Sequence, residues 1–569
     1  MSLRSTKPAI ALCALVLVAC TGADNSKNLS AQYEAPNSST STGIAAAPTG
    51  GLPAEEAARL AKQATFGPTP ELIDQIRRSQ TVEAWLDTQM ALKMSTYSDI
   101  AANGVPSNHC SGLSGQEANI CSRDNFSSLP VAMRFYSNAL NNDDQLRQRV
   151  GFSLSQIIVA SDTKSSRTSG LAAYNQIFLD NAFGNFRDIL KAVTLSPYMG
   201  IYLDTAGSNK SAPNENYARE LMQLFSIGVV ALNSDGTPQT DNSGSPLPAF
   251  AANDVKEISR ALTGWTVSRM PGYAITDNTH GDFSRPMSAV PARFDSGAKS
   301  FLGRTVSAGA SQDQNVDAIV DAVFYHPNTA PFIAKRLIKQ LTIANPTPAY
   351  VERVAAAFVD NGSGQRGDMR AVVRAIYTDS EARVVSQLPG KVKDPVLLAT
   401  SLARAIGFKS DGYAFTTRDL AMGQQPFRAP SVFGFYPDEY PLSQGQGASS
   451  PSSKLMNTAT IVARHNFIYD WTLAGDATRG EYQVQSTIKN AAGSQPSWAA
   501  WEANGADDAK TIDRINLVML NGAMTKGQRE ALLAAMTAVK NNDPALQARK
   551  RAQVALYIVA SSTFFQVDR

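Results

Sequence analysis

The fold class is decided by residues 394–406, Asp-Pro-Val-Leu-Leu-Ala-Thr-Ser-Leu-Ala-Arg-Ala-Ile. Asp394 is a preferred residue for the cap at the start of a helix, and proline is favoured at the position that follows the cap. Leu398, Leu402 and Ile406 then recur at the spacing of one helical face. The segment therefore predicts a helix that begins after Asp394.

The same signals recur on both sides of this helix. Thr69, Pro70 and Glu71 again place a cap, a proline and an acidic residue at a helix start. Further apolar residues at helical spacing are Leu146, Val150, Leu154, Ile157 and Ile158; Phe332, Leu337 and Leu341; Val351, Val354 and Phe358; and Leu556, Val559 and Ala560. The fold class that these residues predict is mainly α.

Segments without helical periodicity separate the predicted helices. The sequence has no sustained run of alternating strands and no internal repeat of about 20–50 residues, although hairpins would fit within residues 267–311. We therefore predict a large irregular multi-helix body with long surface loops. The predicted loops are residues 104–127, 233–252, 267–311, 408–415, 423–452 and 476–510.

The composition limits the possible functions. The chain has 569 residues, 43% of them hydrophobic, so it can bury a large core and is not disordered as a whole. Its 52 basic residues nearly balance 49 acidic ones, which argues against a dedicated nucleic-acid binder. The chain has four histidines and no phosphate loop, nucleophile elbow or HExxH motif, so we predict no metal site and no cofactor.

The first twenty residues have the pattern of an export signal. Arg4 and Lys7 precede an apolar run over residues 8–19 that is too short to span a bilayer. The run ends in Leu-Val-Ala-Cys at residues 17–20, which resembles the bacterial lipobox, so Cys20 is predicted to be lipidated after cleavage. The alternative is that Cys20 is an apolar residue near an ordinary cleavage site.

Thr21 follows the predicted anchor. In the sorting of Gram-negative lipoproteins, Thr rather than Asp at this position favours the outer membrane, so we expect an exported protein that is lipid-anchored in the cell envelope. Residues 21–50 are rich in small and polar residues and predict a tether with a span of about 30 Å. The predicted parts are a signal peptide (1–19), the lipidated cysteine with its tether (20–51) and a helical domain (52–569). Cleavage removes two of the 52 basic residues, so the net charge falls from +3 to +1.

Cys110 and Cys121 are the only thiols that remain after cleavage and lipidation. They lie in a polar segment, and an oxidising envelope favours a disulfide that closes it into a loop. A metal pair with His109 is the alternative, but it lacks a fourth ligand.

The densest polar segment is residues 213–225, Pro-Asn-Glu-Asn-Tyr-Ala-Arg-Glu-Leu-Met-Gln-Leu-Phe. As an α-helix capped by Asn214 and ended by Gly228, it would have a polar face and an apolar face. The polar residues are Asn216, Arg219, Glu220 and Gln223, and the apolar ones are Tyr217, Leu221, Leu224 and Phe225.

The polar face of this segment has two interpretations. Glu215 and Glu220 could act as an acid and a base, with Asn216 and Arg219 beside them, on a water, a sugar hydroxyl or a bound cation. More often such groups form a structural network, in which Arg219 would hold Glu220 and loop carbonyls. A second predicted helix over residues 253–262 carries Glu257 and Arg260, and we hypothesise that these join Arg219 and Glu220 in one network.

The order of motifs along the chain resembles the DUF1800 family, large bacterial proteins that are often exported. The resemblance runs from about residue 52 to residue 569 and is most distinctive over residues 214–225. The other matching segments are 57–60, 64–69, 85–86, 146–150, 261–265, 301–303, 326–327, 391–395 and 561–566. The family often has a His-Asp pair where this chain has Phe294 and Asp295.

The resemblance names no reaction, but it implies a partner. Family members tend to occur beside a second exported family that looks like alkaline-phosphatase-type hydrolases. We therefore hypothesise a non-catalytic binding or assembly protein that works with an exported, phosphatase-like partner at the membrane, without nucleic acid. The alternative is an envelope hydrolase that acts on a glycan or peptide through Glu215 and Glu220.

Overall fold

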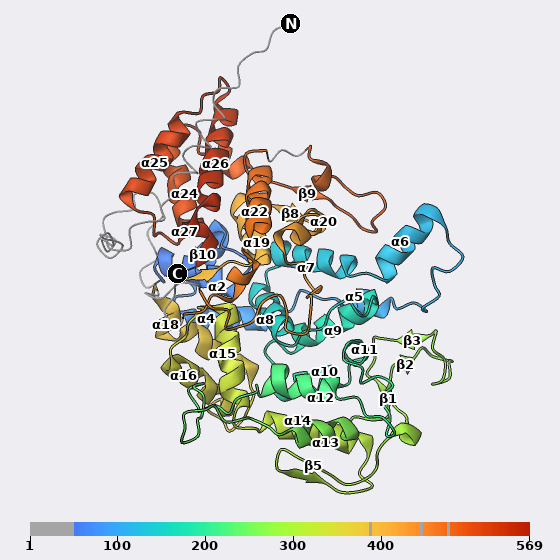
Figure 1. Ribbon diagram of the computed structural model, residues 1–569. Coiled ribbons are helices and arrows are strands. Elements are labelled where there is room, and N and C mark those ends of the chain that lie inside the picture. The colour runs from blue at the N-terminus through green and yellow to red at the C-terminus, as the bar shows by residue number, and fades with distance from the viewer. Residues whose placement is uncertain (1–50, 386–389, 443–447, 475–477, 569) are drawn as a thin grey trace. The chain divides into compact units, whose positions relative to one another are not determined.

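The helix predicted after Asp394 forms as α19, Pro395–Ile406 (Figure 1). The carboxylate of Asp394 accepts a hydrogen bond of 2.8 Å from the backbone N–H of Leu397, and Gly407 ends the helix in the left-handed conformation. All twelve residues of α19 are buried, so the helix lies inside the protein rather than on its surface.

A computed structural model describes residues 51–385, 390–442, 448–474 and 478–568. These residues belong to one unit, Ala45–Arg569. The predicted signal peptide, Cys20 and nearly all of the predicted tether lie outside the described residues. In the described part of the chain, no helix is long and apolar enough to cross a membrane.

Helices dominate the described chain and confirm the predicted mainly α class. In the first half they are α2 (Ala54–Ala64), α3 (Pro70–Arg78), α4 (Val82–Ala91), α5 (Ser98–Ala102), α6 (Gly115–Asn125), α7 (Leu129–Asn141), α8 (Gln145–Ile157), α9 (Thr168–Asp180), α10 (Phe186–Thr194), α11 (Pro197–Tyr202), α12 (Asn216–Glu220), η1 (Leu221–Ser226) and α13 (Ala252–Ala261). In the second half they are η2 (Pro291–Arg293), α14 (Gln312–Phe324), α15 (Thr329–Leu341), α16 (Pro348–Val359), α17 (Met369–Thr378), α18 (Ser380–Arg383), α19, α20 (Tyr413–Thr416), α21 (Asp419–Met422), η3 (Pro451–Leu455), α22 (Thr458–Trp471), η4 (Gly480–Tyr482), α23 (Ala499–Glu502), α24 (Asp508–Leu520), α25 (Lys526–Thr537), α26 (Pro544–Ser561) and α27 (Thr563–Gln566).

The strands are short and pair two by two in antiparallel fashion. They are β1 (Trp265–Thr266) with β4 (Ser288–Ala289), β2 (Ser268–Arg269) with β3 (Gly281–Asp282), β5 (Lys299–Phe301) with β6 (Arg304–Val306), β7 (Lys391–Val392) with β10 (Val567–Asp568), and β8 (Lys409–Ser410) with β9 (Ser494–Gln495). Three of these pairs lie within residues 265–306, so the hairpins expected in the 267–311 loop are confirmed.

Two predicted loops contain helices. Residues 104–127 include α6, of which only Cys121 is buried, so the segment has no apolar stripe to reveal the helix in the sequence. Residues 476–510 include α23 and the start of α24. The described residues of the other predicted loops form short elements and isolated bridges.

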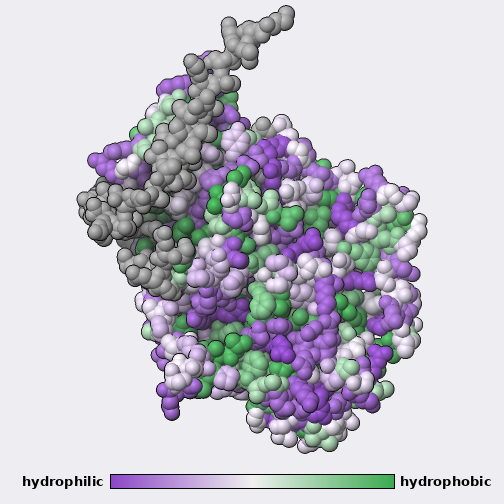
Figure 2. Space-filling model, in the orientation of Figure 1, coloured by the Kyte–Doolittle hydropathy of each residue, from purple (hydrophilic) through white to green (hydrophobic). Residues whose placement is uncertain are grey.

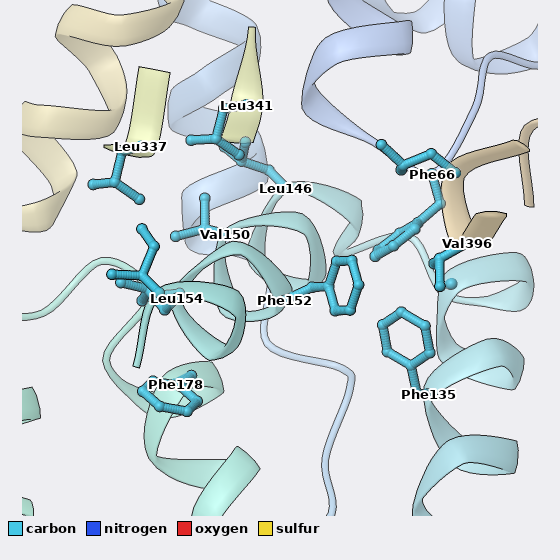
Figure 3. Packing of buried hydrophobic residues seen from close by; sticks show 14 of the residues in the cluster. Phe66, Phe135, Leu146, Val150, Phe152, Leu154, Phe178, Leu337, Leu341 and Val396 are labelled. Carbon is cyan, nitrogen blue, oxygen red and sulfur yellow. The ribbon is translucent and has the colours of Figure 1, made fainter. Parts of the chain in front are cut away.

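The core is built around α8 and extends to both sides of it. Leu146, Val150 and Leu154 of α8 face Leu337 and Leu341 of α15 (Figure 3). On the other side, the rings of Phe66, Phe135 and Phe152 pack together with centroids 4.9–6.0 Å apart. Large apolar side chains removed from water on both faces of α8 make it the centre of the fold.

Candidate functional site

The segment predicted as one α-helix, capped by Asn214 and ended by Gly228, changes its geometry in the middle. After α12 the chain continues as the π-helix η1, in which the N–H of Ile227 reaches back to the carbonyl of Met222 at 2.9 Å. The prediction of an uninterrupted α-helix was therefore wrong beyond Glu220. π-helical turns are rare and lie disproportionately at functional sites, so this geometry singles out the segment.

The end of the segment at Gly228 agrees with the sequence analysis, whereas its start lies one residue later, with Glu215 rather than Asn214 at the N-cap position. The side chain of Asn214 accepts a hydrogen bond of 2.9 Å from the N–H of Asn216, and Gly228 has a φ of 81° just after η1. A Cβ at Gly228 would lie 2.9 Å from the ring of Phe332, so glycine is required there for space as well as for conformation.

The apolar face of the segment fixes it to the core. Tyr217, Leu221 and Phe225 are buried as predicted, whereas Leu224 is only half-buried because the π-helical turn rotates the residues after Glu220. The hydroxyl of Tyr217 lies 2.8 Å from that of Thr194 on α10. This face therefore presents the polar residues at a fixed position on the surface.

Glu215 and Arg219 pair with each other on the solvent-exposed surface and are not part of a buried network. The Nη2 of Arg219 lies 3.0 Å from the Oε2 of Glu215, and both side chains are nearly half exposed. Asn216 is exposed between them. The interpretation in which Arg219 holds Glu220 was wrong, because Arg219 bonds to Glu215 one helical turn earlier.

Glu220 has a different environment from Glu215. It is half-buried, and its Oε2 is shielded from solvent without a hydrogen-bond partner in the described residues. Burial raises the pKa of Glu220, while the nearby charge of Arg219 opposes that shift. The neighbouring Tyr202 has its pKa raised to about 12, chiefly by burial and then by the charge of Glu220. Glu220 is thus a carboxyl group that holds its proton more tightly than an exposed glutamate.

Asp204 and Lys164 belong to the same site and were missed in the sequence. Asp204 has a φ of 60°, a conformation that non-glycine residues rarely adopt. Its carboxylate accepts hydrogen bonds of 2.7 Å from Lys164 and of 2.8 Å from the side-chain amide of Asn216. Backbone strain of this kind tends to collect at functional sites, but no local sequence signal reveals it, because the two partners are distant in the sequence.

The second predicted polar helix forms as α13 but has its own network. Arg260 pairs with Glu257 at 2.8 Å and with Asp295 at 2.9 Å, and these hydrogen bonds raise the pKa of Arg260. In the described part of the chain, no ion pair joins Arg260 or Glu257 to Arg219 or Glu220. The hypothesis of one joint network was wrong, because Arg260 forms its ion pairs with Glu257 and Asp295 instead.

Phe294 and Asp295 stand where the family often has a His-Asp pair. Phe294 is buried, and the ammonium of Lys299 lies 4.9 Å from its ring centroid. Lys299 also donates to the carbonyls of Asp295 and Gly297. Where the family often has a histidine, this chain therefore has the phenyl ring of Phe294, which the ammonium of Lys299 contacts.

The predicted disulfide between Cys110 and Cys121 is present, with the two Cα atoms 5.8 Å apart. It joins the loop before α6 to the helix itself. Since both sulfur atoms are bonded to each other, the alternative of a metal pair with His109 was wrong. Among the described residues, no three histidine, cysteine or acidic side chains are placed to hold a metal ion.

Two pockets lie away from the polar segment. One is a cavity of about 10 Å³ among Tyr174, Phe427 and Phe435. The other is an open pocket of about 470 Å³ between α16 and α17. Glu215, Asn216, Arg219 and Glu220 line neither of these two pockets.

Comparison with known proteins identifies a family. The sequence model of a family described as a protein of unknown function (DUF1800) matches residues 59–567, nearly the whole chain. No curated protein and no solved structure matches the chain. The family match includes α12, η1, α13 and β7, and the chain belongs to the DUF1800 family.

Proposed function

We propose that this protein is a non-catalytic binding or assembly protein of the cell envelope that works with an exported partner. The observation that carries the proposal is the position of Glu215, Asn216 and Arg219. They share an exposed polar surface on a helix whose other face is fixed in the core. A rigid element that presents polar groups to solvent suits recognition of another molecule.

The charges of this surface support a protein partner. Lys164 with Asp204 and Arg219 with Glu215 form two ion pairs, and each of the four side chains is partly exposed. Partly exposed charges of both signs contribute to the specificity and rate of association more than to raw affinity. Elsewhere the surface is also mixed, since hydrophilic and hydrophobic residues are interspersed on the face in Figure 2.

The proposed setting is the envelope, with Cys20 as the lipid anchor and residues 21–50 as the tether. Several acyl chains on one residue would hold the protein firmly, at about 0.8 kcal/mol for each buried CH₂ group. The proposed partner is an exported protein related to alkaline-phosphatase-type hydrolases. The anchor is tested by Cys20→Ala, which is expected to abolish palmitate labelling and release the protein from the membrane fraction. Labelling that persists in Cys20→Ala would contradict it.

Site-specific crosslinking tests the contact surface. A photoreactive residue at position 215 is expected to crosslink one exported hydrolase-like protein in native envelopes, identified by mass spectrometry. A photoreactive residue at Arg78, exposed at the end of α3, is the matched control. Equal crosslinking from both positions, or none from position 215, would contradict the proposal.

A second candidate function is hydrolysis of a glycan or peptide, and Glu220 favours it. A carboxyl group with a raised pKa can keep a proton for a leaving group, while Glu215 could activate water. The test is release of soluble fragments from purified peptidoglycan, and Glu220→Gln is expected to lower that release at least 100-fold at an unchanged melting temperature. Absence of release by the native protein would remove this candidate.

A further inference from the structure

Small side chains of α16 and α17 line the open pocket between these two helices. They are Ala357 of α16 and Ala371, Ala375 and Thr378 of α17. Small side chains on two packed helices leave a hollow that larger ones would fill. The resulting volume of about 470 Å³ is within the usual range for sites that bind small molecules.

Two arginines line one side of the pocket, and one of them has no ion-pair partner among the described residues. Arg370 and Arg374 are one turn apart on α17, and both line the pocket. Arg374 pairs with Asp87 of α4. The guanidinium of Arg370 is exposed and makes no hydrogen bond or ion pair with any residue that the structure describes. A planar guanidinium without a partner is suited to hold a carboxylate through two parallel hydrogen bonds.

The pocket also has an acidic side, in the loop that joins α16 to α17. The Oδ1 of Asp360 accepts the N–H groups of Gly362 and Gly364 at 2.8 and 2.9 Å, but its Oδ2 has no partner within the described chain. Asp368 differs, because one oxygen caps α17 and the other accepts from the amide of Asn361 at 2.8 Å. Asp360 is therefore the carboxylate that remains available for a cation.

We propose that this pocket binds a small zwitterion, a free α-amino acid or a short peptide, with its carboxylate on Arg370 and its ammonium on Asp360. A zwitterion has both the carboxylate that Arg370 can bind and the ammonium that Asp360 can bind, whereas a ligand with a single charge can use only one of these exposed groups. The alanine side chains give an apolar surface for a small side chain. This inference does not depend on the surface formed by Glu215 and Arg219.

Calorimetric titration of the purified full-length protein tests the ligand class. L-Alanine or L-alanyl-L-alanine is expected to bind. N-acetyl-L-alanine lacks the ammonium and L-alaninamide lacks the carboxylate, so each is expected to bind at least tenfold more weakly than L-alanine. Tighter binding of the dipeptide would identify a peptide site, and tighter binding of alanine an amino-acid site. Lack of binding by both zwitterions, or binding of either analogue as tight as that of L-alanine, would overturn the proposal.

Variants of Arg370 and Asp360 test which residue binds the carboxylate of the ligand and which binds its ammonium. Arg370→Gln is expected to weaken L-alanine about tenfold while leaving L-alaninamide unchanged, because only the former has a carboxylate. Asp360→Asn is expected to remove the preference for L-alanine over its N-acetyl form, and Ala371→Leu to block binding by filling the pocket. Arg78→Gln, which removes the same charge elsewhere, is the control. Arg370→Gln with native affinity for L-alanine and a native melting temperature would refute the assignment.

Discussion

The side-chain amide of Asn216 donates a hydrogen bond of 2.8 Å to the carboxylate of Asp204. This bond joins the most distinctive segment of the family to a residue in the left-handed conformation. Lys164 completes the arrangement from the loop before α9, with 2.7 Å to both carboxylate oxygens. The two donors hold Asp204 in a conformation that its own backbone disfavours, and Asp204 in turn orders the start of α12.

We expect Asn216→Ala to lower the free energy of unfolding by about 1 to 2 kcal/mol, because it removes a hydrogen bond to a charged group. Urea denaturation of the native and variant proteins measures the difference. Asn242→Ala is the control, since Asn242 is exposed and makes no side-chain hydrogen bond among the described residues. A loss no larger than that of Asn242→Ala would mean that the bond to Asp204 contributes nothing to stability.

Helix starts could be predicted from the sequence where a capping residue bonds to a backbone N–H within the next turn of the helix. The start of α19 was predicted because Asp394 bonds to an N–H only three residues away, and the same holds for Thr69 at α3. Helical periodicity placed Asn216 and Arg219 on one polar face, but it did not determine whether that face is exposed. The switch to a π-helix after Glu220 could not be predicted, because no residue type in residues 221–226 distinguishes a π-helical turn from an α-helical one.

Contacts between distant segments decided the remaining features. Arg260 bonds to Asp295, which is 35 residues away, so its local pattern suggested a different partner. The strain at Asp204 depends on Lys164, 40 residues earlier. The helix α6 buries only Cys121, so the disulfide was predictable from composition while the helix was not.

The last strand is predicted to stabilise the whole fold through Asp568. The carboxylate of Asp568 pairs with Lys393 and, at 3.3 Å, with Lys62, and both ammonium groups are nearly buried. Asp568→Ala would leave two buried cations without their acid and is expected to lower the free energy of unfolding by about 3 kcal/mol. Chemical denaturation at pH 7 checks this.

The control for Asp568 is Glu530→Ala, since Glu530 is exposed and only 3.9 Å from Lys526. Exposed ion pairs of this kind contribute about 0 to 1 kcal/mol. If the two variants lost equal stability, the pairing of β10 with β7 would not depend on the buried ammonium groups.

The disulfide is predicted to protect a surface segment rather than the core. Cys110 and Cys121 close a loop whose other residues are largely exposed. Replacing both with serine is expected to destabilise this segment by about 2 to 3 kcal/mol and to speed proteolytic cleavage within residues 104–127 at least tenfold. Limited proteolysis with mass spectrometry locates the cuts, and the melting temperature reports the core. Faster cleavage spread evenly along the chain would show that the disulfide supports the whole fold.

Asp419 is predicted to make stability fall as the pH rises. It is 2% exposed, it accepts a hydrogen bond of 3.2 Å from Gln425, and burial raises its pKa from 3.8 to about 7. Tyr136 and Arg428 are the titratable groups near it, and the pKa of Tyr136 is also raised. Because the folded state holds this proton more tightly than the unfolded state, the contribution is complete below pH 3.8 and is lost as the pH rises through about 7.

The size of this contribution is a few kcal/mol, on the order of the shift of about three pKa units. The measurement is the free energy of unfolding at pH 4.5, 6 and 8 for the native protein and for Asp419→Asn. The variant keeps the shape of the side chain and cannot ionise, so the difference between the two proteins is expected to grow in its favour as the pH rises. Other titrating groups are common to both proteins and cancel in that difference. A difference that stays constant from pH 4.5 to 8 would show that Asp419 does not hold a proton in the folded state.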